Sequence, residues 1–75
     1  MNIGTIVHLN SNPELLMTVA YVCGEEPNGM QEKLFSQQMK ILGYEKGDVY
    51  CTWFEGQTLK NAPFKAKMLT ITESK

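Results

Sequence analysis

One histidine and two cysteines are the side chains best suited to metal binding or nucleophilic catalysis. His8, Cys23 and Cys51 are the only residues of these types in the chain. A zinc site normally shows closely paired cysteines or a second histidine, and neither pattern occurs. A nucleophilic Cys51 would need a cation or a helix N-terminus beside it, whereas Val49 and Trp53 place it on the inner face of a strand. We therefore expect no metal site, cofactor or catalytic residue, and an inert, buried Cys51.

Acidic residues offer a second route to chemistry. Glu25 and Glu26 stand side by side in a segment rich in glycine and proline, and Asp48 precedes a β-rich run. Their spacing matches no calcium-binding loop, and the chain has no phosphate-binding glycine motif, nucleotide fingerprint or hydrolase elbow. We interpret these carboxylates as solvated surface charge, and an enzyme is the least favoured class of function.

The balance of charge bears on nucleic-acid binding. The net charge is −1, the pI is about 5.7, and all seven basic residues are lysines. Nucleic-acid binding draws on concentrated positive charge, and arginine is the preferred donor to phosphate and guanine. A weak nucleic-acid-binding barrel remains an alternative function, with six of these lysines as phosphate contacts: Lys33, Lys40, Lys46, Lys60, Lys65 and Lys67.

The chain carries no sign of export. No segment reaches the apolar length of a transmembrane helix, and the first residues lack the basic start and apolar core of a signal peptide. Two cysteines are few for a small secreted domain. We expect a cytoplasmic protein with both cysteines as free thiols and no membrane partner.

Two strands are predicted in the first third of the chain. Residues 5–9 are β-branched, residues 10–14 are rich in turn formers, and residues 16–22 again favour a strand. Alternation predicts five inward side chains: Val7, Leu9, Met17, Val19 and Tyr21.

A helix is predicted over residues 30–42. The segment lacks Gly, Pro and Val, Asn28 can cap its start with Gln31 completing a capping box, and Gly43 can end it. Its predicted packing face consists of Met30, Leu34, Ile41 and Leu42, with Phe35 at the edge. The alternative is a long hairpin with strands at 33–36 and 39–44.

The last third is predicted to be a meander. Residues 48–54 form the most β-prone strand, 55–57 turn the chain, and an irregular strand over 57–60 and 64–65 is interrupted at 61–63. Pro63 favours an edge or a bulge. Residues 68–72 close the domain, with Leu69 and Ile71 inward. The pattern predicts a single mainly β domain over 1–75, a small antiparallel SH3-like barrel of about five strands with residues 24–47 inserted between strands two and three.

Two groups of residues carry a family resemblance. The first comprises Gly4, Val7, Leu9, Ser11, Pro13 and Met17-Thr18-Val19; the second comprises Cys51-x-Trp53-Phe54-x-Gly56, Leu59, Phe64 and Leu69. With this pattern the chain resembles the YodC-like family of small, uncharacterised bacterial proteins. Thr5 and Asn10 depart from the family pattern, and residues 24–47 form a longer segment than is usual. The resemblance implies a compact β-barrel-like fold and no particular activity.

Aromatic side chains give the best candidate for a binding site. If Val49, Cys51 and Trp53 face the core, Tyr50 and Phe54 lie on the opposite face. The predicted partner-binding surface comprises Ile6, His8, Tyr50 and Phe54. The competing interpretation is that residues 30–42 cover this face. The favoured function is a non-catalytic protein- or peptide-binding adaptor module with an unidentified partner, and weak self-association is a further expectation.

Overall fold

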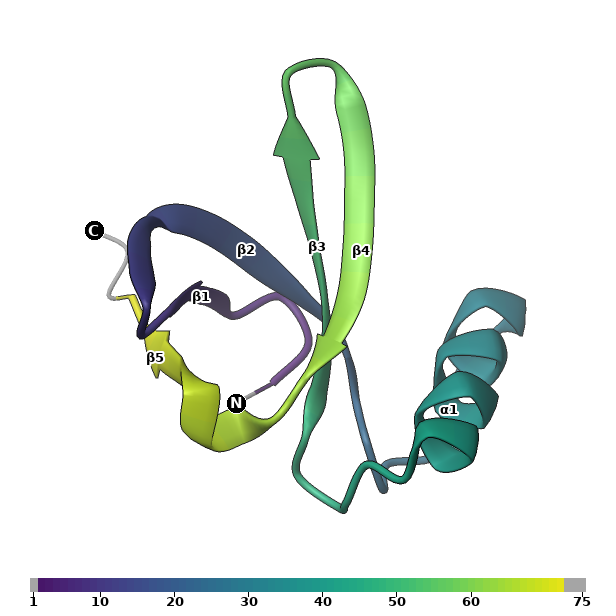
Figure 1. The fold of residues 1–75 in the computed structure, drawn as a ribbon. Coiled ribbons are helices and arrows are strands. Elements are labelled where there is room, and N and C mark those ends of the chain that lie inside the picture. Colours follow the sequence, from purple (N-terminus) through teal and green to yellow (C-terminus); the bar gives the residue numbers. More distant parts are fainter. Residues whose placement is uncertain (1, 73–75) are drawn as a thin grey trace.

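The computed structural model describes residues 2–72, so residues 1 and 73–75 of the predicted domain lie outside it. In this range five antiparallel strands form one sheet in the order β4-β3-β2-β1-β5, and one helix flanks it (Figure 1). The strands are β1 (Ile6–Leu9), β2 (Asn12–Val22), β3 (Val49–Glu55), β4 (Thr58–Phe64) and β5 (Leu69–Ile71), and the helix is α1 (Met30–Leu42). A 3₁₀ turn, η1 (Ala66–Met68), precedes β5. The mainly β prediction is confirmed, but the sheet is open, with β4 and β5 at its edges.

Two strands differ in extent from their predictions. The loop expected at 10–14 is shorter, because β2 already begins at Asn12 and runs through Pro13. The interruption expected at 61–63 is absent, and β4 is continuous with Pro63 opposite Tyr50. Since β4 is an edge strand, Pro63 can leave one side of the ladder without an N–H group at little cost. The prediction of an edge position is therefore confirmed.

A bulge in β2 divides the core into two clusters. Val19 pairs with Cys51, but the next pair is Tyr21 with Tyr50, so Ala20 is an extra residue on β2. An extra residue reverses the alternation of side chains along the rest of the strand. Tyr21 therefore lies on the opposite face from Val19, which corrects the prediction that all five inward residues share one face.

The first cluster fills the face enclosed by β1, β2, β3 and β5. Its buried members are Val7, Met17, Val19, Val22, Val49, Cys51 and Leu69. Trp53 is only partly buried and packs at its margin, tilted against Phe64 with 6.0 Å between ring centroids. Ile71 is 52% exposed, contrary to prediction, although it pairs with the buried Val7; it is the last residue of β5, an edge strand with a neighbour on one side only.

The helix begins and ends as predicted at residues 30 and 42, so the hairpin alternative is wrong. Gly43 has φ 83°, and its N–H donates to the Lys40 carbonyl while the Tyr44 N–H donates to the Met39 carbonyl. This pair of bonds is a Schellman motif, in which glycine adopts the left-handed conformation without strain. The predicted capping box is wrong: Gly29 is the N-cap.

The start of α1 is held by a different side chain from the one expected. The Glu32 carboxylate accepts a hydrogen bond from the Asn28 backbone N–H at 3.3 Å. Gly29 itself has no side chain with which to cap the helix. A carboxylate in the first turn also interacts favourably with the positive end of the helix dipole.

The side of α1 that packs on the sheet differs from the predicted one. Phe35, Ser36 and Met39 are buried on α1. Phe35 and Met39 join Tyr21, Cys23 and Tyr50 as the buried members of the second cluster. The predicted packing residues are instead exposed: Met30 at 81%, Leu34 at 60%, Ile41 at 84% and Leu42 at 57%. The bulge explains the difference, because it places Tyr21 and Tyr50 on the same face of the sheet. Phe35 and Met39 pack with these two tyrosines, and Phe35 stacks on Tyr50.

Candidate functional site

Tyr50 is the one predicted surface residue that the helix covers. Its side chain is 4% exposed, and its ring stacks on Phe35 with centroids 4.1 Å apart and planes 13° apart. The hydroxyl donates to Gln38 Oε1 at 2.8 Å and lies 3.2 Å from the Asn61 side-chain amide. Burial raises the pKa of Tyr50. Tyr50 therefore anchors α1 to the sheet and is not free to contact a partner.

The other three predicted residues share the outer face of the sheet, with β2 lying between Phe54 on β3 and the other two on β1. Ile6 and His8 are half-buried on β1, and Phe54 is 70% exposed near the tip of the β3–β4 hairpin. The strand register shows which face they occupy. Ile6 pairs with Thr18, and Thr18 pairs with Thr52, which is two residues before Phe54. Alternation therefore gives Ile6, His8 and Phe54 the same face.

Leu59 extends the exposed apolar surface around Phe54. It lies directly opposite Phe54 on β4 and is 51% exposed. The β3–β4 hairpin extends past α1 in Figure 1, and the helix leaves both members of this pair more than half exposed. Phe54 and Leu59 thus form an uncovered cross-strand apolar pair.

A groove lies between Leu59 and the helix. It has a volume of about 410 Å³ and runs between the first turn of α1 and the outer face of β2, β3 and β4. Its walls include Ala20, Met30, Gln31, Phe35, Thr52 and Leu59. Apolar side chains of both the helix and the sheet therefore line one hollow.

The outer face of α1 is a second apolar surface. It consists of Met30, Leu34 and Ile41, which are spaced four and seven residues apart and so lie on one side of the helix. All three are more than half exposed. The spacing of these residues in the sequence predicts packing within the domain, whereas in the structure they are exposed. The exposed apolar surface is defined here as Met30, Leu34, Ile41, Phe54 and Leu59.

The residues considered for chemistry lie apart and have structural surroundings. Cys51 is fully buried in the first cluster, and burial raises the pKa of its thiol to about 11. Cys23 is a buried free thiol in the second cluster, and His8 Nδ1 hydrogen-bonds to the Leu9 carbonyl at 3.1 Å. Within residues 2–72 no group of three or more His, Cys, Asp or Glu side chains could hold a metal ion.

Asp48 has a structural role. Its side chain is 8% exposed, and Oδ2 accepts from the Glu45 N–H at 2.9 Å while Oδ1 accepts from the Ala66 N–H at 3.0 Å. The carboxylate thereby joins the turn before β3 to the segment after β4. Both oxygens are occupied by backbone donors, which is typical of a structural buried carboxylate.

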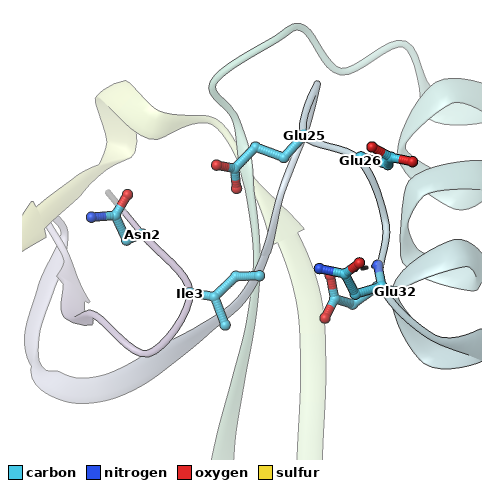
Figure 2. Close-up of a pocket in the computed structure, with 6 residues that line it drawn as sticks. Asn2, Ile3, Glu25, Glu26 and Glu32 are labelled. Atoms are coloured by element: carbon cyan, nitrogen blue, oxygen red, sulfur yellow. Dashed lines mark hydrogen bonds between the residues drawn. The ribbon is translucent and has the colours of Figure 1, made fainter.

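The acidic residues of the β2–α1 connection line a separate hollow of about 500 Å³ with Asn2 and Ile3. Glu25 and Glu26 are exposed, and their carboxylates point away from each other (Figure 2). Glu32 supplies the third carboxylate but is already bonded to the Asn28 N–H. The arrangement does not form the paired carboxylates that acid–base catalysis needs.

No protein-family model, curated protein or solved structure matches this chain. In the part of the chain that the structure describes, no helix has the length and apolar character required to cross a membrane.

Proposed function

We propose that this chain is a non-catalytic module that binds a protein or peptide through the exposed apolar surface, in the cytoplasm. The observation that carries the proposal is the exposure of the cross-strand pair Phe54 and Leu59, of which Leu59 lines a groove together with residues of α1. Aromatic and apolar anchors next to a concave surface are the usual core of protein-binding sites. The side chains that define this surface are all apolar, so they can contribute to binding but carry no nucleophile, acid or base.

The fold proposed for this module is an SH3-like barrel of the YodC-like kind. Support comes from the strand order, from the 3₁₀ turn before the last strand, and from a long β2 that pairs with both β1 and β3. Further support is that many of the residues carrying the resemblance lie in the first cluster, namely Val7, Met17, Val19, Cys51 and Leu69. Small barrels of this type present binding surfaces on a rigid scaffold.

Crosslinking from within the surface tests the proposal. A photoreactive phenylalanine analogue placed at position 54 should give one covalent adduct with an identified protein. The same analogue at Ile71, which is 52% exposed on the other edge strand, should give none and is the matched control. Phe54→Ser and Leu59→Ser should each weaken binding of that protein by about 30-fold, as expected for the loss of about 2 kcal/mol at a central anchor.

Two results would contradict this function. Equal adducts from positions 54 and 71 would mean that the surface has no special role. Salt-dependent binding of a single-stranded oligonucleotide that is unchanged in Phe54→Ser would favour the alternative of nucleic-acid binding through the exposed lysines.

A further inference from the structure

The apolar face of α1 has the pattern of a coiled-coil seam. Met30, Leu34, Gln37 and Ile41 follow one another at intervals of four, three and four residues. This is the alternating spacing of the a and d positions in a heptad repeat. Leu34 and Ile41 take the a positions, and Met30 and Gln37 take the d positions. Side chains at these positions are the ones that interlock with a second helix.

This seam is open in the folded domain. Met30 and Ile41 are 81% and 84% exposed, so the domain itself buries little of either side chain. The opposite side of α1 already makes the internal contacts through Phe35 and Met39. A helix that holds its place with one side and presents an apolar stripe on the other has a free surface for a second helix.

The charges beside the seam indicate which kind of partner helix would bind there. Lys33 and Lys40 stand seven residues apart and both take g positions, so they line the same flank of the stripe. The other flank has uncharged Gln31 and Gln38 at the e positions. A partner helix with carboxylates facing the lysine flank gains two ion pairs, whereas a basic helix meets like charge.

We propose that the outer face of α1 binds an amphipathic helix of a partner protein that carries Asp or Glu along one flank of its apolar stripe. This inference rests on the proposed protein-binding function and specifies the partner for the helical half of the surface. Since α1 has 13 residues, it is about 20 Å long and matches a partner helix of similar length. Leu59, which is paired with Phe54, then lies near the Met30 end of the seam, because Leu59 and Met30 line the same groove.

A second copy of the chain is a poorer occupant. In an antiparallel pair of helices the g positions of the two chains face each other, so Lys33 of one copy would face Lys40 of the other. A lipid surface also fits less well, because interfacial helices bury a broad apolar face and α1 offers a narrow stripe. An extended peptide would instead pair with an edge such as β4, where Pro63 cannot donate an N–H.

A displayed library of amphipathic helices tests the proposed partner. Each member has leucine at its a and d positions and either Glu or Lys at its flanking positions, and the full-length folded chain is the target. Selection should enrich Glu-flanked members. Leu34→Gln should weaken the selected peptides by at least tenfold, and so should the double change Lys33→Glu with Lys40→Glu, which replaces two attractive pairs by repulsive ones. The double variant should now prefer the Lys-flanked peptides.

A control separates the flank from net charge. Lys60→Glu makes a charge change of the same kind on β4, where Lys60 pairs with Trp53 and so lies on the face opposite Phe54 and Leu59. It should leave the affinity for the selected peptides within about twofold, as expected for a screened distant charge. Circular dichroism should show the same helix content in all variants.

Several results would overturn the inference. These are enrichment of Lys-flanked members, no enrichment of either kind, and binding that Leu34→Gln does not change. Leu34-dependent dimerisation in sedimentation would assign the seam to a second copy, and Leu34-dependent binding to anionic vesicles would assign it to a lipid surface. If the library fails but the adduct at position 54 forms and depends on Leu59, only this inference is wrong. If both fail, the proposed function is wrong as well.

Discussion

Phe35→Ala should release α1 from the sheet while the first cluster stays folded. Phe35 is 8% exposed and stacks on Tyr50, and it is one of the two apolar side chains of α1 that are buried in the second cluster, the other being Met39. Truncating a buried Phe to Ala costs about 3–5 kcal/mol, of which an aromatic pair accounts for about 0.5–1.5 kcal/mol. A free helix of 13 residues is marginal in water, so α1 cannot persist without this attachment.

The magnitude can be measured by amide hydrogen exchange. A loss of about 3 kcal/mol in docking lowers the protection of the α1 amides by about 100-fold. Amides of Val19 and Cys51 in the first cluster should lose much less, because none of their side-chain neighbours in that cluster is removed. Chemical shifts should show coil values over α1 and native values in β1, β2 and β3.

Leu34→Ala is the matched control for this experiment. It truncates a large side chain on the same helix, but Leu34 is 60% exposed, so its cost should stay within about 0.5 kcal/mol. Unchanged α1 protection in Phe35→Ala would refute the reasoning. So would equal losses in the two variants, or a uniform loss over helix and sheet, since each would mean that the second cluster is not what holds α1.

Four other predictions concern individual groups. Burial raises the pKa of Cys51 from 9.0 to about 11, so the thiol ionises at lower pH in the unfolded chain than in the folded one. The free energy of unfolding should therefore be unaffected by this group below pH 9 and should fall between about pH 9 and 11. Burial also raises the pKa of Tyr50, which lowers the free energy of unfolding at high pH in the same direction. Comparing urea unfolding of Cys51→Ala with that of the parent over this pH range isolates the contribution of Cys51. Asp48→Asn should cost about 1–3 kcal/mol, because one amide oxygen cannot serve both backbone donors; an unchanged urea midpoint would contradict this. Gly43→Ala, at φ 83°, should cost about 1–2 kcal/mol and lower the melting temperature by several degrees, whereas an unchanged melting temperature would show that the motif is not strained by a side chain. Alkylation in denaturant without reductant should label both Cys23 and Cys51, and an unlabelled chain two hydrogens lighter would show a disulfide.

Local sequence signals located most of the elements correctly. Good helix formers followed by Gly43 predicted both ends of α1, because helix propensity and the left-handed stop are properties of short segments. The strand at residues 49–55 was also visible in its β-branched and aromatic residues. Pro63 correctly indicated an edge, but it could not indicate whether β4 stops there, since an edge strand tolerates the missing donor.

The rotation of α1 and the division of the core could not be predicted from local patterns. The stripe of Met30, Leu34 and Ile41 is as apolar as the side that packs, and hydrophobic spacing alone does not say which side meets the sheet. The bulge at Ala20 left no signal either, because it occurs within an unbroken strand-forming run. Only the paired register shows that one residue is extra.

The bulge and the exposed seam are parts of one arrangement. Without the extra residue, Tyr21 would lie with Val19 on the first cluster and could not stand beside Tyr50. Because the bulge turns Tyr21 to the other face, the two tyrosines make a floor on which Phe35 and Met39 pack. Packing α1 on the sheet by that side fixes its rotation, and this rotation leaves Met30, Leu34 and Ile41 exposed. A one-residue change in strand pairing thus determines which helix face a partner can reach.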